Sequence, residues 1–186
     1  MLKKIAKFDE KFSRYLYTHR LSSNADSWLR RYTRLGDGYV WALIAILIGI
    51  VDGPLFLAKV LAQVAPSLVA ALVLYWIVKL TSKRRRPFEA IPEFKALVPP
   101  LDKYSFPSGH TMNNLAIATT VLLAVPVAGA VMIALPLTWG FLRVYFGVHW
   151  LSDVIGGFLL GILSFAIGHV VWIFAISPLV AGFFQG

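Results

Sequence analysis

The stretch HTMNNLAIATTVLLAVPVAGAVMIALPLTWGFLRVYFGVHW, residues 110–150, contains a single charged residue, Arg143. A transmembrane helix needs about 20 mostly apolar residues, so this stretch is long enough for two of them. Residues 126–129 (PVAG) fall near its middle, where proline and glycine favour a tight turn. The stretch therefore predicts two membrane-spanning helices, at 110–127 and 129–148.

The flanking segments repeat the pattern. Residues 39–78 form a second apolar block that is interrupted only near 52–59, and residues 151–176 form a third block. These blocks predict further helices at 39–56, 58–80 and 151–176. The predicted fold class is an all-α, polytopic helical membrane protein with about five transmembrane helices over 39–176, inside a single membrane-embedded domain, 1–186.

Composition excludes several other classes of protein. Of the 186 residues, 58% are hydrophobic and 15% are charged, and the mean hydropathy is +0.71. Typical soluble domains have about 25% charged residues, so neither a soluble globule nor a disordered chain is expected. The chain has no cysteine, which excludes disulfides, thiolate nucleophiles and cysteine-bound metal centres.

Positive charge is concentrated near the N-terminus and in one loop. The net charge is +9, and the 18 basic residues include nine in residues 1–38 and seven in residues 79–103. The N-terminal arm, 1–38, carries apolar residues at helical spacing with lysines between them. We expect an amphipathic interfacial helix on anionic lipid, and the alternative is a helix packed on the membrane domain. Nucleic acid is not an expected partner, because the rest of the chain suits lipid.

Counting the spans places several polar residues on one side of the membrane. The second span ends at Lys79, the third begins at His110 and the fourth ends near His149. Because each span crosses once, these three places share one face. An ionisable residue at membrane depth is a functional candidate by default, since burying it costs at least about 2.5–3.5 kcal/mol. The face gathers Lys79, Arg86, His110, Arg143, His149 and Asp153.

This set of residues suits the chemistry of a phosphate group. Lysine and arginine clustered at a partly desolvated site bind anions. His149 and Asp153 are four residues apart on a predicted helix, so the carboxylate can fix the imidazole tautomer and leave the other nitrogen free to attack. His110 is then the candidate general acid. Two histidines and a carboxylate could also ligate a metal, but the neighbouring cations favour an anion, so no metal is expected.

Three motifs carry a resemblance to a known family. They are Lys79 with Arg86-Pro87, then 107–110 (PSGH), then Arg143 with His149 and Asp153. In this order and spacing they resemble the signature of the type 2 phosphatidic acid phosphatase superfamily, the lipid phosphate phosphatases. The resemblance covers residues 79–153 directly.

The resemblance implies a role for each matching residue. It makes His149 the nucleophile that forms a phosphohistidine, Asp153 the group that orients it, and His110 the acid and then the base. It assigns phosphate binding to five residues, namely Lys79, Arg86, Ser108, Gly109 and Arg143. It implies no metal and no cofactor. Leu142 stands where the family usually has serine, which removes one secondary hydroxyl.

The implied activity is hydrolysis of a phosphomonoester or pyrophosphate on a lipid headgroup. Expected substrates are phosphatidylglycerophosphate, phosphatidic acid, undecaprenyl pyrophosphate or lipid A 1-phosphate. We expect loop 81–106 and the N-terminal helix to roof the site, with headgroup selection by loop side chains, namely Phe88, Phe94, Asp102, Lys103 and Tyr104. The alternatives are a lipid phosphotransferase that uses a lipid pyrophosphate donor, and a catalytically silent membrane protein.

The family and the charge distribution disagree about orientation. The resemblance implies an integral inner-membrane protein whose active site faces the periplasm. The positive-inside rule places the lysine- and arginine-rich face in the cytoplasm. We favour the family's orientation, because several of these cations have a phosphate to bind. The sequence leaves the oligomeric state open.

Overall fold

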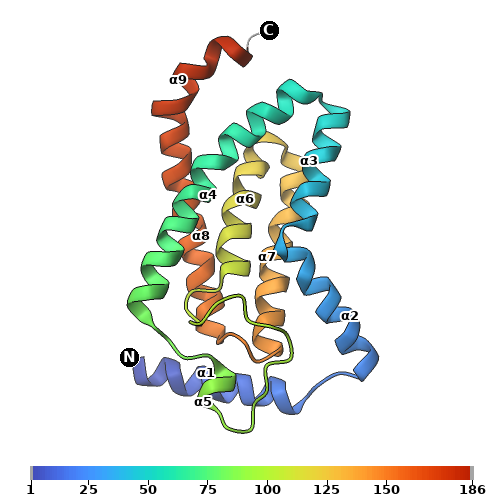
Figure 1. Ribbon diagram of the computed structural model, residues 1–186, viewed down its shortest axis with the longest axis vertical. Helices are drawn as coiled ribbons and strands as arrows, with labels where there is room; N and C mark the ends of the chain where they lie inside the picture. The colour runs from blue at the N-terminus through green and yellow to red at the C-terminus, as the bar shows by residue number, and fades with distance from the viewer. Residues whose placement is uncertain (1, 185–186) are drawn as a thin grey trace.

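In the computed structural model, which describes residues 2–184, the chain forms an upright helical bundle with one helix laid across its end (Figure 1). The bundle helices are α3 (Tyr39–Val51), α4 (Pro54–Ser82), α6 (Gly109–Ala124), α7 (Pro126–Tyr145) and α8 (Leu151–Val171). Helix α8 continues through a π-helical turn (Trp172–Ile176) into α9 (Ser177–Val180) and a 3-10 turn (Ala181–Phe184). The described residues contain no strand, as the sequence predicts.

Helix α6 is the centre of the bundle and packs against α4, α7 and α8. Its sequence is rich in alanine and threonine, and its small polar groups pair inside the bundle: Thr120 Oγ1 donates to Ser67 Oγ of α4 at 3.0 Å. Glycines let α8 approach closely, since a Cβ at Gly161 would lie 2.8 Å from the Met112 carbonyl oxygen of α6. Small residues at helix interfaces are typical of membrane bundles.

Among the described residues, three helical stretches are long and apolar enough to cross a membrane: Pro54–Ala90, Pro126–Tyr145 and Leu151–Phe183. The other two expected spans differ from the prediction. The segment expected at 39–56 is the 13-residue helix α3, which reaches the required length only with Ser23–Asp37, at a bend of 58°. The segment expected at 110–127 is the 16-residue helix α6, which the other helices surround.

The breaks between helices follow the local sequence. Helix α4 begins at Pro54 after Gly53, whose φ of +90° favours glycine. Helix α7 begins at Pro126, which suits the first turn of a helix because proline lacks an amide hydrogen there. Both breaks lie inside the ranges that the sequence indicates.

The N-terminal arm forms two helices. Helix α1 (Leu2–Thr18) lies across the end of the bundle and packs on α7 and α8, and its position at a membrane interface stays a prediction (Figure 1). Its outer face exposes Phe8 and Tyr15, together with the lysines. Helix α2 (Ser23–Arg34) and a 3-10 turn (Leu35–Asp37) then lead into α3.

The segment between α4 and α6 covers the same end of the bundle as α1 (Figure 1). It contains the short helix α5 (Pro87–Ala90). Phe94 is buried with Ile91 and Trp150, and its ring stacks on Tyr17 of α1 at 4.2 Å between centroids. The loop and α1 therefore hold each other over the end where α4 finishes and where α6 and α8 begin.

Candidate active site

Three cations from separate elements are buried at this end. Lys79 lies in the last turn of α4, Arg86 precedes α5, and Arg143 lies in the last turn of α7. Their exposed fractions are 1%, 1% and 4%. Lysine and arginine are almost never fully buried unless they are paired, so this end of the bundle holds an unusual concentration of positive charge.

The Asp102 carboxylate is the counter-ion of two of these cations. Its Oδ1 lies 2.6 Å from Lys79 Nζ and 3.0 Å from Arg86 Nη2, and Tyr75 donates its hydroxyl to Oδ2. Burial raises the pKa of the Asp102 carboxyl, but hydrogen bonds from Lys79 and Tyr75 outweigh it and leave the pKa below its ordinary value. Asp102 is thus the protein's own anionic partner for Lys79 and Arg86.

His149 lies in the loop that joins α7 to α8. Its amide donates to the Arg143 carbonyl at 3.2 Å, and Gly147, with φ +72°, allows the chain to turn there. The ring Nε2 lies 3.3 Å from Arg86 Nη1. Burial, together with the cations of Arg86 and Arg143, holds the pKa of the His149 imidazole well below its usual range. The ring is therefore neutral at neutral pH, which a nucleophile requires.

Asp153 lies beside His149, in the first turn of α8. Its Oδ2 lies 3.5 Å from His149 Nδ1 and accepts the Trp150 amide at 2.7 Å. Its Oδ1 accepts a hydrogen bond from Arg84 Nη1 at 2.6 Å. The carboxylate is fully buried, and its position at a helix N-terminus is favourable for a negative charge.

The first turn of α6 presents Ser108, Gly109 and His110 to the same end. The Ser108 amide donates to the Asp153 carbonyl at 3.0 Å, which ties α6 to α8, and its hydroxyl accepts from Thr111 Oγ1 at 3.3 Å. A Cβ at Gly109 would lie 2.9 Å from the Tyr75 ring, so only glycine allows this close approach. His110 is 5% exposed.

The structure brings all the sequence-predicted site residues to one end of the bundle. They come from the C-terminal ends of α4 and α7, the N-terminal ends of α6 and α8, and the adjoining loops. The residues are Lys79, Arg86, Ser108, Gly109, His110, Arg143, His149 and Asp153. Leu142, at the position where the family usually has serine, is buried in an apolar cluster with Tyr145, Phe146 and Val148.

Some loop residues expected to face a headgroup do not do so. Phe94 is buried in an apolar cluster and Phe88 packs against that cluster, so both hold the loop in place. Tyr104 contributes its carbonyl oxygen, which accepts from Lys79 Nζ at 2.8 Å. Asp102 contacts the cations directly, as described above.

The sequence did not single out two residues that contact the site, Asp37 and Arg84. Asp37 Oδ1 lies 3.0 Å from His110 Nε2. Arg84 belongs to a basic run, 83–85, that is typical of solvated surface, yet its guanidinium contacts Asp153. Neither contact has a local sequence signal, because each joins elements that are distant along the chain.

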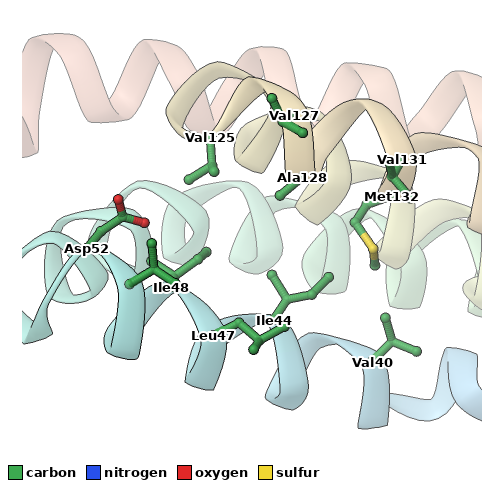
Figure 2. A pocket seen from close by; sticks show the side chains of 11 residues that line it. Val40, Ile44, Leu47, Ile48, Asp52, Val125, Val127, Ala128, Val131 and Met132 are labelled. Atoms are coloured by element: carbon green, nitrogen blue, oxygen red, sulfur yellow. The ribbon is translucent and has the colours of Figure 1, made fainter.

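A cleft of about 520 Å³ adjoins His110. It has apolar walls from α3, α4 and α6, including Trp41, Leu72 and Ile117, and polar groups from Asn113 and Asp37. A second cavity of about the same volume lies between α3 and the start of α7 (Figure 2). Its lining is aliphatic apart from Asp52, and it contains none of the site residues. Of the two, only the first cleft is lined by site residues, Gly109 and His110.

In the part of the chain that the structure describes, no group of three or more histidine and carboxylate side chains is placed to hold a metal ion. The site is a cluster of buried cations and two histidines at one end of apolar helices. That combination defines a helical membrane protein with an anion-receptive site at one end of its bundle.

The chain belongs to the PAP2 superfamily, whose model matches residues 60–177. This confirms the family that the three motifs indicate. The chain is 34% identical over 136 residues to an undecaprenyl-diphosphatase from Sulfolobus acidocaldarius, covering 69% of this chain. It is 34% identical over 89 residues to phosphatidylglycerophosphatase B from Bacillus subtilis, covering 40% of this chain. The chain spans 62% and 41% of the lengths of these two relatives.

Two solved structures share the fold. LpxE from Aquifex aeolicus matches with a TM-score of 0.68 and 28% identity, over 85% of this chain and 92% of that one. A transmembrane PAP2-type phosphatidylglycerolphosphate phosphatase from Bacillus subtilis matches with a TM-score of 0.64 and 26% identity, over 89% of this chain and 84% of that one. The all-α membrane fold is therefore that of PAP2 membrane proteins.

Proposed function

We propose that this protein is an integral membrane lipid phosphate phosphatase that works through a phosphohistidine. One observation carries the proposal: the neutral His149 ring lies 3.3 Å from Arg86, and the positive charges of Arg143 and Lys79 act on it as well. An imidazole poised beside several anion-binding groups suits nucleophilic attack on a phosphoryl group. Residues 1–186 act as one membrane-embedded unit in this proposal.

The phosphate oxygens bind the three cations, Lys79, Arg86 and Arg143. Ser108 and the Gly109 amide, at the N-terminus of α6, add hydrogen-bond donors, as helix N-termini commonly do for phosphates. When the phosphoryl group arrives, it displaces the Asp102 carboxylate from the cations. These groups stabilise the charge on the equatorial oxygens during transfer.

The reaction has two steps. His149 Nε2 forms a bond to phosphorus while the bond from phosphorus to the lipid oxygen breaks, and His110 gives its proton to that oxygen. Asp153 stabilises the charge on the His149 ring through Nδ1. His110 then takes a proton from water, whose oxygen attacks the phosphohistidine, and inorganic phosphate and free His149 result. The residues present carry this sequence without a metal or cofactor.

The position of the cleft supports a lipid leaving group. The cleft adjoins His110, the proposed acid, and its walls of Trp41, Leu72 and Ile117 suit an apolar chain. Relatives named for undecaprenyl diphosphate and phosphatidylglycerophosphate support the substrate class. We propose a phospholipid, polyprenyl or lipid A phosphate, with phosphatidylglycerophosphate, phosphatidic acid, undecaprenyl pyrophosphate and lipid A 1-phosphate as the panel to test.

The test is phosphate release from this panel in detergent with EDTA present. We expect release by the wild type and none by His149→Ala, with a His169→Ala variant retaining activity because His169 lies in α8 and stacks on Phe165, apart from the site. Release that survives His149→Ala contradicts the mechanism, and no release from any substrate contradicts the function. Product analysis with and without an acceptor lipid separates hydrolysis from phosphotransfer.

We propose that the protein lies in the inner membrane with its site facing the periplasm. Since the chain has no cysteine, Lys95→Cys and Asp52→Cys each introduce a single thiol. Lys95 is exposed in the loop over the site, and Asp52 lies between α3 and α4. In intact cells an impermeant thiol reagent should label Lys95→Cys and spare Asp52→Cys. The reverse pattern places the site in the cytoplasm, as the positive-inside rule predicts.

A further inference from the structure

Two buried carboxylates from opposite ends of the chain share the first turn of α8. Asp153 accepts the Trp150 amide, and Asp9 of α1 accepts the Ser152 amide at 3.0 Å through Oδ1. Their exposed fractions are 0% and 1%. Two buried negative charges in one turn repel each other and lose hydration, so they require a shared positive partner.

Arg84 is that partner. Its Nη1 donates to Asp153 Oδ1 at 2.6 Å, and its Nη2 donates to Asp9 Oδ2 at 2.7 Å. Nη1 also donates to Ser152 Oγ at 2.7 Å. The planar guanidinium fork suits this bridge, because its two nitrogens reach two carboxylates at a fixed separation. The Trp150 ring lies under the guanidinium, 5.5 Å from centroid to Cζ.

We propose that Arg84 and Asp9 are positioning residues for the nucleophile: they hold Asp153 against His149 and make the docking of helix α1 a requirement for catalysis. The proposal rests on the proposed function. Neither side chain is expected to touch the substrate. Both act through Asp153, whose Oδ2 faces His149 while its Oδ1 is held by Arg84.

The charges around His149 predict the direction in which the pH profile of kcat/KM moves in each variant. The Arg84 cation offsets the negative charge of Asp153, and that negative charge favours protonation of His149. Without Arg84, His149 keeps its proton to higher pH. The acid limb, which is the low-pH side of the pH profile of kcat/KM, therefore moves to higher pH. Asp9→Asn leaves Arg84 as the partner of Asp153 alone, so the acid limb does not move upward. The other charged groups around His149 are unchanged in these variants: Lys79, Arg86, Asp102, His110 and Arg143.

The experiment compares Arg84→Gln, Arg84→Lys and Asp9→Asn in detergent on the lipid phosphate that the wild type hydrolyses best. We expect Arg84→Gln to lower kcat about 10- to 100-fold with little change in KM, as misplaced catalytic groups do. Its acid limb should move up by about 0.5 pH unit or more. Arg84→Lys keeps the charge without the fork, so it should restore the acid limb and recover kcat only in part. Asp9→Asn should lower kcat without the upward shift.

Matched controls come from the neighbouring residues. Arg85→Gln removes an exposed cation next to Arg84, and Glu10→Gln removes an exposed carboxylate next to Asp9. Both should keep the wild-type kcat and pH profile. If Arg84→Gln does not fold, Arg84→Lys and Asp9→Asn still test the positioning role, because both should lower kcat without moving the acid limb to higher pH.

The outcomes separate this proposal from the proposed function. A wild type that releases phosphate, an inactive His149→Ala and an Arg84→Gln variant with an unchanged profile overturn the positioning role alone. Equal shifts of the acid limb to higher pH in Arg84→Gln and Asp9→Asn overturn it as well, because a general disordering of the site would change the pH profiles of both variants in the same way. Absence of activity in the wild type overturns the proposed function instead.

Discussion

Asp37 Oδ1 lies 3.0 Å from Nε2 of His110, at the bend where the helix preceding α3 meets the bundle. Gly36, the neighbour of Asp37, lies so close to Trp139 and His110 that a Cβ there would sit 2.9 Å and 3.0 Å from their rings. Its carbonyl accepts a hydrogen bond from Asn114 of α6 at 3.0 Å. The bend is therefore fixed against α6, and Asp37 is held beside the proposed general acid.

The first prediction concerns this pair. Asp37→Asn removes the charge that stabilises protonated His110, so the variant should be a weaker acid catalyst toward a lipid alkoxide. We expect kcat/KM to fall about 10- to 100-fold for the lipid phosphate and less than about 3-fold for p-nitrophenyl phosphate, whose leaving group needs little protonation. Asp52→Asn, at the other end of α3, is the control. Equal losses on both substrates contradict the role of Asp37 in proton transfer.

Asp102 gives the second prediction, because it occupies the cations that the phosphate would bind. Asp102→Asn keeps an acceptor for Lys79 but removes the competing charge. Inorganic phosphate should then inhibit about 3- to 10-fold more strongly, measured as its inhibition constant. Glu93→Gln, which removes an exposed carboxylate from the same loop, should leave the constant unchanged. Weaker inhibition in Asp102→Asn would show that the carboxylate chiefly orients the cations.

The third prediction uses the lowered pKa of His149. The folded protein disfavours the protonated ring, so below the ordinary imidazole pKa of 6.5 the unfolded chain binds this proton more readily than the folded one. Stability from this group is unchanged above that pH and is lost progressively as the pH falls below it. The Tm of the wild type should therefore fall faster than that of His149→Gln between about pH 7 and pH 5. Parallel curves for the wild type and His149→Gln contradict this prediction.

The fourth prediction separates packing from chemistry with two glycines of α8. A Cβ at Gly157 would lie 2.7 Å from the Ser108 carbonyl oxygen, and a Cβ at Gly168 would collide with the backbone of Ser67 in α4. Both alanine variants overpack a helix interface, which costs about 1–3 kcal/mol of stability. Gly157→Ala should also lower kcat, because it displaces the first turn of α6. Gly168→Ala should lower Tm with kcat retained, and the reverse pattern refutes the assignment.

The sequence predicted the helical membrane class, the breaks near 52–59 and 126–129, and the shared end of the bundle. These follow from apolar length and from counting crossings, which are local properties. The lengths of α3 and α6 were not predicted correctly from hydropathy. Hydropathy alone does not show that α6 is enclosed by other helices. It also does not show that α3 is joined to the preceding helical segment across a bend of 58°.

The motif residues were predictable from their spacing, whereas their partners were not. Asp37 meets His110, Asp102 meets Lys79, and Arg84 meets Asp9 and Asp153 only because the chain folds back on itself. Arg84 sits between Lys83 and Arg85, and nothing in that run distinguishes the one side chain that turns inward. Burial of a charge depends on the tertiary fold, so it is invisible in composition.

The crossing of α1 beneath the bundle has a consequence for biogenesis. Asp9 is synthesised before the bundle helices α3 to α8, yet its partner amide at Ser152 is synthesised 143 residues later. Helix α1 must therefore wait for its contact with α8 until that helix, the last long one described, has been inserted. Chains that end before α8 cannot make this contact and also lack Asp153, so the proposed site is complete only after α8 has been synthesised.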